Sequence, residues 1–298
     1  MCGICGIIYK DKSKVVDREV LARMNQSLTH RGPDEEGYFI NRNTGLGMRR
    51  LSIIDVKGGH QPLFNEDRSI CVICNGEIYN YQELRRELEQ KGHKFSTKSD
   101  IEVIVHLYED LKESFVHKLR GMFAIAIWDS LEDKLILIRD RLGIKPLYHT
   151  YQKGVFLFAS ELKGILQYPG LEKNLSLEAL SDYLSYFYIP AAGTIFEGIF
   201  KVPPAHMLSF NKGNISLSKY WEIDYAKKEE RTKNRDADRL RLSARQAARA
   251  FGCGYCSCRR QPRERRFGIQ RYAARFIGRY ALPHPRRHSR REKYPRDH

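Results

Sequence analysis

Apolar and polar residues alternate along the first 224 residues in short stretches that predict strands separated by helices. Near-continuous apolar runs are typical of strands whose two faces are both buried. An apolar strand is also expected at the N-terminus, in CGICGIIY, and another at 69–74, where Asn75 and Gly76 form the commonest hairpin-turn signal. The content is therefore that of an α/β chain with buried sheets. The expected buried strands are 122–129, 134–140 and 155–160.

Helical spacing of the apolar residues predicts amphipathic helices between these strands. Asp17 is a candidate N-cap for the first helix. Ser99 and Glu102 have the spacing of a capping box, which predicts that another helix begins there. Further helices are expected at about 80–91, 161–168 and 177–187, with short strand-like runs as far as 51–56 and again up to 224. The apolar face of the first helix would hold Val20, Leu21, Met24 and Leu28.

The formal net charge of +16 is concentrated near the C-terminus. Residues 235–298 contain 18 Arg and one Lys against five acidic residues, which leaves residues 1–234 with about +2. Such a segment can bind nucleic acid through phosphate contacts, and the interleaved aromatic residues could stack on bases. Its composition is equally that of a disordered tail, which is the default we expect, with no nucleic-acid partner. The aromatic residues are Phe267, Tyr272, Phe276 and Tyr280.

Hydropathy and cysteine usage exclude two other classes of protein. The sequence has no run of about 18 apolar residues, which a membrane helix needs. Its N-terminus has no basic stretch followed by an apolar one, so we expect neither a signal peptide nor a membrane partner. Seven cysteines, an odd number thinly spread, do not resemble a secreted disulfide framework, and the expected location is the cytoplasm.

Two CxxC pairs, Cys2 with Cys5 and Cys71 with Cys74, raise the question of a zinc site. Paired CxxC knuckles usually lie some 15–20 residues apart, whereas 65 residues separate Cys5 from Cys71. In a strand, residues three apart point to opposite faces, so Cys71 and Cys74 could not easily share a metal. We therefore expect Cys5, Cys71 and Cys74 to be small buried thiols.

Cys2 differs from the other cysteines because of its position. Removal of Met1 ahead of a small residue would leave Cys2 with a free α-amino group, whose ordinary pKa is about 7.7–8.0. That amine could accept the thiol proton and generate a thiolate nucleophile. One residue would then supply both the nucleophile and the base.

Eight motifs occur in the order typical of one family. The chain resembles the N-terminal glutaminase domain of glutamine-hydrolysing asparagine synthetases, over residues 2–224. The resemblance implies a class II glutamine amidotransferase with the N-terminal-nucleophile hydrolase fold, an α+β four-layer αββα sandwich. The motifs are MCGICGI, HRGPD (30–34), RRLSIID (49–55), NGEIYN (75–80), KSDIEV (98–103), RGMFAIAIWD (120–129), RDRLGIKPLY (139–148) and SELK (160–163).

The same resemblance implies a role for each residue of a glutamine site. L-glutamine would be hydrolysed through a thioester, with no metal and no cofactor. Without the resemblance each residue has a simpler interpretation: a turn for Asn75 and Gly76, a surface charge for Arg50, a solvated side chain for Glu77, and a complement to a helix dipole for Asp100. The implied roles are nucleophile for Cys2, α-carboxylate binding for Arg50, pocket lining for Ile53 and Ile54, oxyanion hole for Asn75 and Gly76, and ammonium binding for Glu77 and Asp100.

Members of this family continue into a synthetase domain that acts on aspartate and MgATP and holds the ATP pyrophosphate in an SGGxDS loop, and that motif is missing from this sequence. Residues 225–298 are therefore expected to be a truncated or frameshifted, Arg-rich remnant of that domain, which translation of the other two reading frames would test. Three cysteines there, Cys253, Cys256 and Cys258, form at most a weak metal site. A catalytically inactive binding module remains an alternative function.

Overall fold

The computed structural model describes residues 2–224. The expectations for the Arg-rich segment, its aromatic residues and its three cysteines lie outside the described residues. Within them, no helix is both long and apolar enough to span a bilayer.

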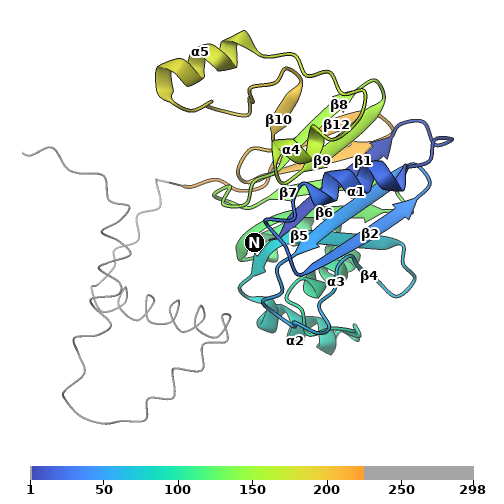
Figure 1. Cartoon of the computed structure of the whole chain (residues 1–298). Helices are drawn as coiled ribbons and strands as arrows, with labels where there is room; N and C mark the ends of the chain where they lie inside the picture. Colours follow the sequence, from blue (N-terminus) through green and yellow to red (C-terminus); the bar gives the residue numbers. More distant parts are fainter. Residues whose placement is uncertain (1, 225–298) are drawn as a thin grey trace, which may run out of the picture. The chain divides into compact units, whose positions relative to one another are not determined.

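Two antiparallel sheets form the centre of the described region (Figure 1). The first has the strand order β10-β8-β9-β1-β3-β2, and its strands are β1 (Gly3–Tyr9), β2 (Glu35–Asn41), β3 (Thr44–Arg50), β8 (Tyr148–Gln152), β9 (Val155–Ala159) and β10 (Ile199–Lys201). The second has the order β12-β11-β7-β6-β5-β4, and its strands are β4 (Leu63–Phe64), β5 (Ile70–Ile78), β6 (Gly121–Asp129), β7 (Lys134–Arg139), β11 (His206–Asn211) and β12 (Asn214–Lys219).

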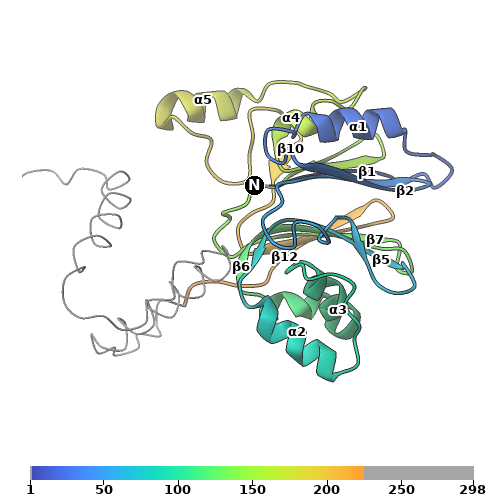
Figure 2. The same cartoon turned by 60° about the horizontal axis from the view of Figure 1, so that its bottom comes forward.

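Helices cover the outer face of each sheet, which gives four layers in the order helix, sheet, sheet, helix (Figure 2). One apolar cluster fills the space between α1, α4 and the first sheet, a second lies between the two sheets, and a third lies between the second sheet and α2, α3 and the 3-10 helix η1. The predicted αββα sandwich is confirmed. The helices are α1 (Arg18–Gln26), α2 (Tyr81–Gln90), α3 (Glu102–Leu111), η1 (Lys112–Lys118), α4 (Leu162–Ile165) and α5 (Leu177–Tyr186).

The pattern of apolar residues predicted α1 correctly. The Asp17 carboxylate accepts a hydrogen bond from the Glu19 N–H at 2.8 Å and caps the helix. The apolar face of α1 then packs on the first sheet, as its 3.6-residue period requires. The apolar residues of that face are Val20, Leu21 and Met24, and Leu28, which follows the end of the helix, packs in the same cluster.

The predicted capping box at Ser99 and Glu102 is wrong, although α3 begins within a few residues of it. The N-cap residue is Ile101, and the Ser99 hydroxyl accepts from the Ile101 N–H at 3.2 Å. The Glu102 carboxylate instead accepts backbone hydrogen bonds from Ser96 at 2.6 Å and Thr97 at 2.8 Å. Those N–H groups belong to the loop that precedes the helix, so Glu102 orders this loop rather than the helix end.

The predicted turn at Asn75 and Gly76 is also wrong. Strand β5 runs without interruption through both residues to Ile78 and pairs with β6 along its whole length. The expected strand-like run at 51–56 is a loop, because β3 ends at Arg50. Both corrections place polar residues of the proposed glutamine site on regular strands or directly after them.

The two cysteines of β5 point to opposite faces, as predicted from the strand period. Cys71 packs in the cluster between the sheets, and Cys74 packs under the helices of the second sheet. Cys5 lies in the cluster between α1 and the first sheet. All three thiols are buried, and the four cysteines of the described residues are free.

Candidate active site

The outer edge of β5 is completed by side chains rather than by a strand. Strand β4 pairs with β5 only at Cys71 and Val72. Further along, the Cys74 N–H donates to the Gln61 side-chain oxygen at 2.7 Å, and the Ile78 N–H donates to an Asp100 carboxylate oxygen at 2.9 Å. Backbone groups of alternate residues face the same edge of an antiparallel strand, so the Gly76 N–H between them faces this edge too.

The hydrogen bonds of β6 independently support this orientation of the Gly76 N–H. Phe123 lies opposite Gly76. Its N–H donates to the Asp140 carboxylate at 3.3 Å, and its carbonyl accepts from the Asp140 N–H at 2.8 Å. Because both backbone groups of Phe123 are directed away from β5, the Gly76 N–H is not bound to β6.

Gly76 is required by close approach of the neighbouring strand. A Cβ atom added there would lie 2.2 Å from the Met122 carbonyl oxygen and 2.6 Å from the Phe123 Cα. Both contacts are with backbone, which cannot move aside without disturbing the β5–β6 pairing. Glycine is therefore required here because the backbone of β6 leaves no room for a side chain, and not because the chain turns.

Asn75 and Glu77, on either side of Gly76, carry buried polar atoms without partners. Both sit on the same face of β5 as Cys71, which faces the space between the sheets. The Asn75 side chain is 0% exposed, and neither its nitrogen nor its oxygen has a hydrogen-bond partner among the described residues. One Glu77 carboxylate oxygen is likewise buried and unpartnered. Unpaired buried polar atoms are rare and costly, so they indicate a ligand site.

Cys2 lies directly before β1 and packs against the same inter-sheet cluster. Its Sγ accepts a hydrogen bond from the Leu51 N–H at 3.5 Å. Burial raises the pKa of the Cys2 thiol, while the Leu51 hydrogen bond and the charge of Arg50 lower it and the charge of Asp100 raises it. Because Leu51 directly follows Arg50, its hydrogen bond to the sulfur places Cys2 next to the end of β3.

Arg50 is almost fully buried at the end of β3. One of its terminal nitrogens binds the Glu35 carboxylate at 2.8 Å, and the other donates to the carbonyls of Ile54 at 3.0 Å and Asp55 at 2.8 Å. The structure thus brings Ile54 to Arg50 through its backbone, as expected for a pocket-lining backbone group. The Ile53 side chain is 44% exposed. The interpretation of Arg50 as a surface charge is wrong.

Asp100 stands outside α3, so its interpretation as a partner of the helix dipole is wrong as well. Its carboxyl group is 4% exposed. Burial raises its pKa to about 6, assisted by the negative charge of Glu77 and opposed by the Ile78 N–H and by Arg50. Asp100 binds the N–H of Ile78, which directly follows Glu77 in β5, so both carboxylates belong to the same stretch of the strand.

A family model described as a glutamine amidotransferase domain matches residues 1–221 of this chain. The chain belongs to that family. The predicted family is therefore confirmed, and this region is a class II glutamine amidotransferase domain. The roles of the individual residues within it stay predictions.

Curated relatives of this glutamine amidotransferase domain are mostly asparagine synthetases. The chain is 42% identical over 228 residues to glutamine-hydrolysing asparagine synthetase 1 of Bacillus subtilis, which covers 76% of the chain and 36% of that protein. It is 48% identical over 185 residues to asparagine synthetase 2 of the same organism, covering 61% of the chain and 24% of that protein. The chain thus spans only about a quarter to a third of the length of these relatives.

Solved structures place the amidotransferase domain in the N-terminal-nucleophile hydrolase fold, as predicted. A glutamine phosphoribosylpyrophosphate amidotransferase from B. subtilis superposes with a TM-score of 0.53 at 19% identity, covering 74% of this chain and 49% of that one. A structure titled the allosteric regulatory enzyme of purine biosynthesis gives 0.55 at 20% identity, with the same coverage. At these identities the likeness concerns the fold alone.

Sequence reasoning missed a group of polar residues that supports Cys2 in this amidotransferase. The Arg31 Nε donates to the Cys2 carbonyl at 2.9 Å, and another Arg31 nitrogen binds the Glu161 carboxylate at 2.8 Å. His30 and Lys163 also contact Glu161, at 3.0 Å and 3.3 Å. These residues belong to the HRGPD and SELK motifs, which are 130 residues apart in sequence, so no local pattern could have joined them.

Proposed function

We propose that this domain hydrolyses L-glutamine to glutamate and ammonia through a thioester on Cys2. The observation that carries the proposal is the buried, unpartnered Asn75 amide, which shares the inter-sheet space with Cys2 and neighbours the free Gly76 N–H. Two hydrogen-bond donors beside a nucleophile are what a tetrahedral oxyanion requires.

Activation of the nucleophile depends on the N-terminus. Because burial raises the pKa of the Cys2 thiol, the thiol is protonated at neutral pH and needs a base. Removal of Met1 would place the α-amine of Cys2 beside its own sulfur. The amine accepts the thiol proton, and the thiolate attacks the side-chain amide carbon of glutamine.

The remaining steps follow from this geometry. Attack forms the S–C bond and moves the carbonyl electron pair onto oxygen, where the Asn75 amide and the Gly76 N–H stabilise it. Collapse breaks the C–N bond, and the protonated α-amine gives its proton to the departing nitrogen, which leaves as ammonia. A water then attacks the thioester carbon and passes a proton to the amine. The C–S bond breaks, the sulfur takes the proton back from the amine, and glutamate is released.

The amino-acid end of the substrate would bind at charged groups on either side of this centre. Glu77 and Asp100 would receive the substrate ammonium. Arg50 would receive the α-carboxylate: its three hydrogen bonds to Glu35, Ile54 and Asp55 use three of the five N–H donors of a guanidinium.

Glutamate release from glutamine by the purified chain tests the proposal. We expect glutamate and ammonia in equal amounts, and an intact mass that lacks Met1. Asparagine, whose side chain is one methylene shorter, serves as the control substrate and should be hydrolysed far more slowly. A folded chain without Met1 that leaves glutamine unchanged would overturn the proposal.

The raised pKa of Asp100 predicts a pH-dependent affinity for glutamine. Above pH 6 Asp100 is ionised and attracts the substrate ammonium, whereas below pH 6 it is protonated and loses this attraction. We therefore expect KM to rise as the pH falls through about 6, and Asp100→Asn to raise KM above pH 6, where Asp100 is ionised, and to flatten this dependence. Because ionising Asp100 in the folded chain is unfavourable, the same variant should be more stable than the original above pH 6. A KM that is constant between pH 5 and 7.5 would contradict the role of Asp100.

Glu161 is expected to act as a positioning residue through Arg31. Burial raises its pKa, but hydrogen bonds from Arg31, His30 and Lys163 outweigh burial and lower it to about 2, so Glu161 stays ionised at all working pH values. Glu161→Gln should loosen Arg31 and displace Cys2, with kcat about 10- to 100-fold lower and KM nearly unchanged.

Steady-state kinetics of three variants check this expectation. Glu172→Gln removes a comparable ion pair on the surface, with Lys153, and should leave kcat unchanged. Glu161→Asp should recover part of the lost rate, because it restores the charge. Equal kcat values for Glu161→Gln and Glu172→Gln would show that Glu161 does not position Cys2.

The use of the ammonia is proposed from the relatives alone. We propose that it serves the ATP-dependent amidation of aspartate, with MgATP bound by an intact synthetase domain of the kind expected in full-length family members. Supplying the remaining part of such a relative as a separate chain, and following ¹⁵N from the glutamine amide into asparagine, tests this proposal. Label that appears only in free ammonia would count against it.

A further inference from the structure

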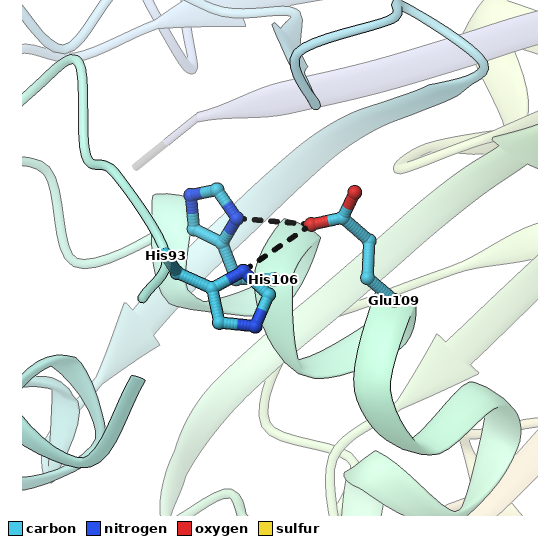
Figure 3. A group of neighbouring side chains, drawn as sticks. All are labelled: His93, His106 and Glu109. Atoms are coloured by element: carbon cyan, nitrogen blue, oxygen red, sulfur yellow. Dashed lines mark hydrogen bonds and ion pairs between the residues drawn. The ribbon is translucent and has the colours of Figure 1, made fainter. Parts of the chain in front are cut away.

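A second polar cluster lies in the helical layer over the second sheet, away from the residues proposed to bind glutamine. His93, from the loop after α2, and His106 and Glu109, from α3, direct three ligand atoms within 4.8 Å of one another (Figure 3). The Nδ1 atoms of His106 and His93 lie 3.0 Å and 3.7 Å from the same Glu109 carboxylate oxygen. His106 is 2% exposed, and the other two side chains are half-buried.

Surrounding residues fix the orientation of these side chains. The His93 Nε2 contacts the Asp110 carboxylate at 2.9 Å, and Lys91 holds Asp110 from its other oxygen at 2.7 Å. Asn65 donates to the second oxygen of Glu109 at 3.0 Å. A carboxylate on the far nitrogen of a histidine is the arrangement that orients metal-binding histidines.

Hydrogen bonding within the cluster leaves one pair of acceptor atoms, on His93 and Glu109, facing each other without a proton between them. When His93 is neutral and donates its Nε2–H to Asp110, its Nδ1 carries a lone pair. That lone pair faces the Glu109 carboxylate oxygen, which is also an acceptor. A cation between the two acceptors would turn this repulsion into attraction.

We propose that His93, His106 and Glu109 bind a divalent transition-metal ion, zinc by the nature of the donors. Two imidazole nitrogens and one carboxylate oxygen suit Zn²⁺, with water completing the coordination. Tetrahedral zinc with bonds of about 2.0–2.1 Å separates its ligand atoms by roughly 3.3 Å. The two distances to Glu109, 3.0 Å and 3.7 Å, lie on either side of this value.

The spacing of the ligands indicates a structural role for the ion. His106 and Glu109 are three residues apart on one face of α3, so their positions are set by the helix. His93 comes from the loop that continues to Asp100, and its side chain is joined to α3 by the contact with Asp110. Zinc would fix the beginning of that loop against α3, while Glu102 already holds its middle at Ser96 and Thr97.

One feature of His106 limits the expected affinity. Metal binding at Nδ1 moves the proton of neutral His106 to Nε2, which is buried and has no hydrogen-bond partner among the described residues. A buried donor without a partner is unfavourable. With only three protein ligands, we therefore expect a dissociation constant in the micromolar range.

Calorimetric titration with Zn²⁺ of the full chain, purified with a chelator that is then removed, tests the proposal. All variants carry Cys253→Ser, Cys256→Ser and Cys258→Ser, so that these thiols cannot bind the added metal. We expect one site, and a loss of affinity of at least 100-fold in His93→Gln. Asp110→Asn should weaken binding by about 10- to 100-fold, and His117→Gln, an exposed histidine elsewhere on the surface, should leave it unchanged.

Co²⁺ as a spectroscopic probe gives a second measurement. Bound cobalt should show visible absorption without the near-ultraviolet bands of thiolate ligands, and His93→Gln should abolish it. Thermal melts without metal establish that each variant is folded. The absence of saturable Zn²⁺ binding up to 100 μM, or wild-type affinity in a folded His93→Gln variant, would overturn the proposal.

Discussion

Replacing Cys2 with alanine is expected to abolish glutamate release, lowering kcat by about 10⁴-fold or more. Every covalent step of the proposed reaction passes through the Cys2 sulfur, and no other thiol within residues 2–224 can replace it. Cys5, Cys71 and Cys74 are buried in apolar clusters, where burial raises their pKa values far above the ordinary thiol value. Alanine is also small, so Met1 should still be removed and the variant should differ only by the sulfur. Continuous measurement of glutamate checks the result.

Cys5→Ala is the matched control for this variant. Its thiol lies in the cluster beneath α1, where the sulfur donates to the Asn25 side-chain oxygen at 4.0 Å, so its loss should reduce stability slightly and leave kcat unchanged. Cys2→Ser should retain a small fraction of the activity, because its hydroxyl is a weaker nucleophile. Activity in Cys2→Ala comparable with that of Cys5→Ala would disprove the thioester mechanism.

Asn75→Ala is expected to lower kcat by about 10²- to 10³-fold while leaving the fold as stable as before or more stable. The lost rate reflects the loss of one of the two oxyanion donors. The variant should stay stable because the Asn75 amide has no hydrogen-bond partner, so that removing it leaves no protein group unpaired. It also removes the unfavourable free energy of burying an unpaired amide, about 1–3 kcal/mol. Opposite changes in activity and stability are typical of residues kept for function.

Asn25→Ala provides the matched comparison for Asn75→Ala. Asn25 is equally buried, but its nitrogen donates to the Met48 carbonyl at 3.2 Å and its oxygen faces the Cys5 thiol. Its replacement leaves these partners unsatisfied, so we expect a loss of stability and little change in kcat. Chemical denaturation and steady-state kinetics of both variants measure the two effects. If Asn75→Ala were as destabilising as Asn25→Ala and kept its rate, Asn75 would be a structural residue.

Sequence patterns predicted the elements of this fold better than their boundaries. The helices α1, α2 and α3 and the buried strands β6, β7 and β9 follow from the period and length of their apolar runs. The wrong predictions concern residues whose local sequence favours one conformation while contacts with distant parts of the chain stabilise another. Asn75 and Gly76 have the residue types of a turn, but nine pairs with β6 hold this segment extended.

The composition of the candidate site could be predicted only in part, because its members are joined by contacts distant in sequence. The resemblance identified Cys2, Arg50, Asn75 and Asp100 from motifs. It could not show that Gln61 and Asp100 bind the edge of β5, because side-chain contacts to a strand edge leave no periodic pattern in the sequence.

The contacts that leave the Gly76 N–H free also protect the second sheet from association with other chains. An exposed strand edge is a template for pairing with a strand from another molecule. Along β5 beyond β4, the Gln61 amide and the Asp100 carboxylate already occupy the N–H groups on either side of Gly76. An incoming strand would have to displace both side chains and to approach a buried carboxylate. The edge can therefore bind a small molecule at one N–H group, but it cannot form continuous hydrogen bonds with another strand.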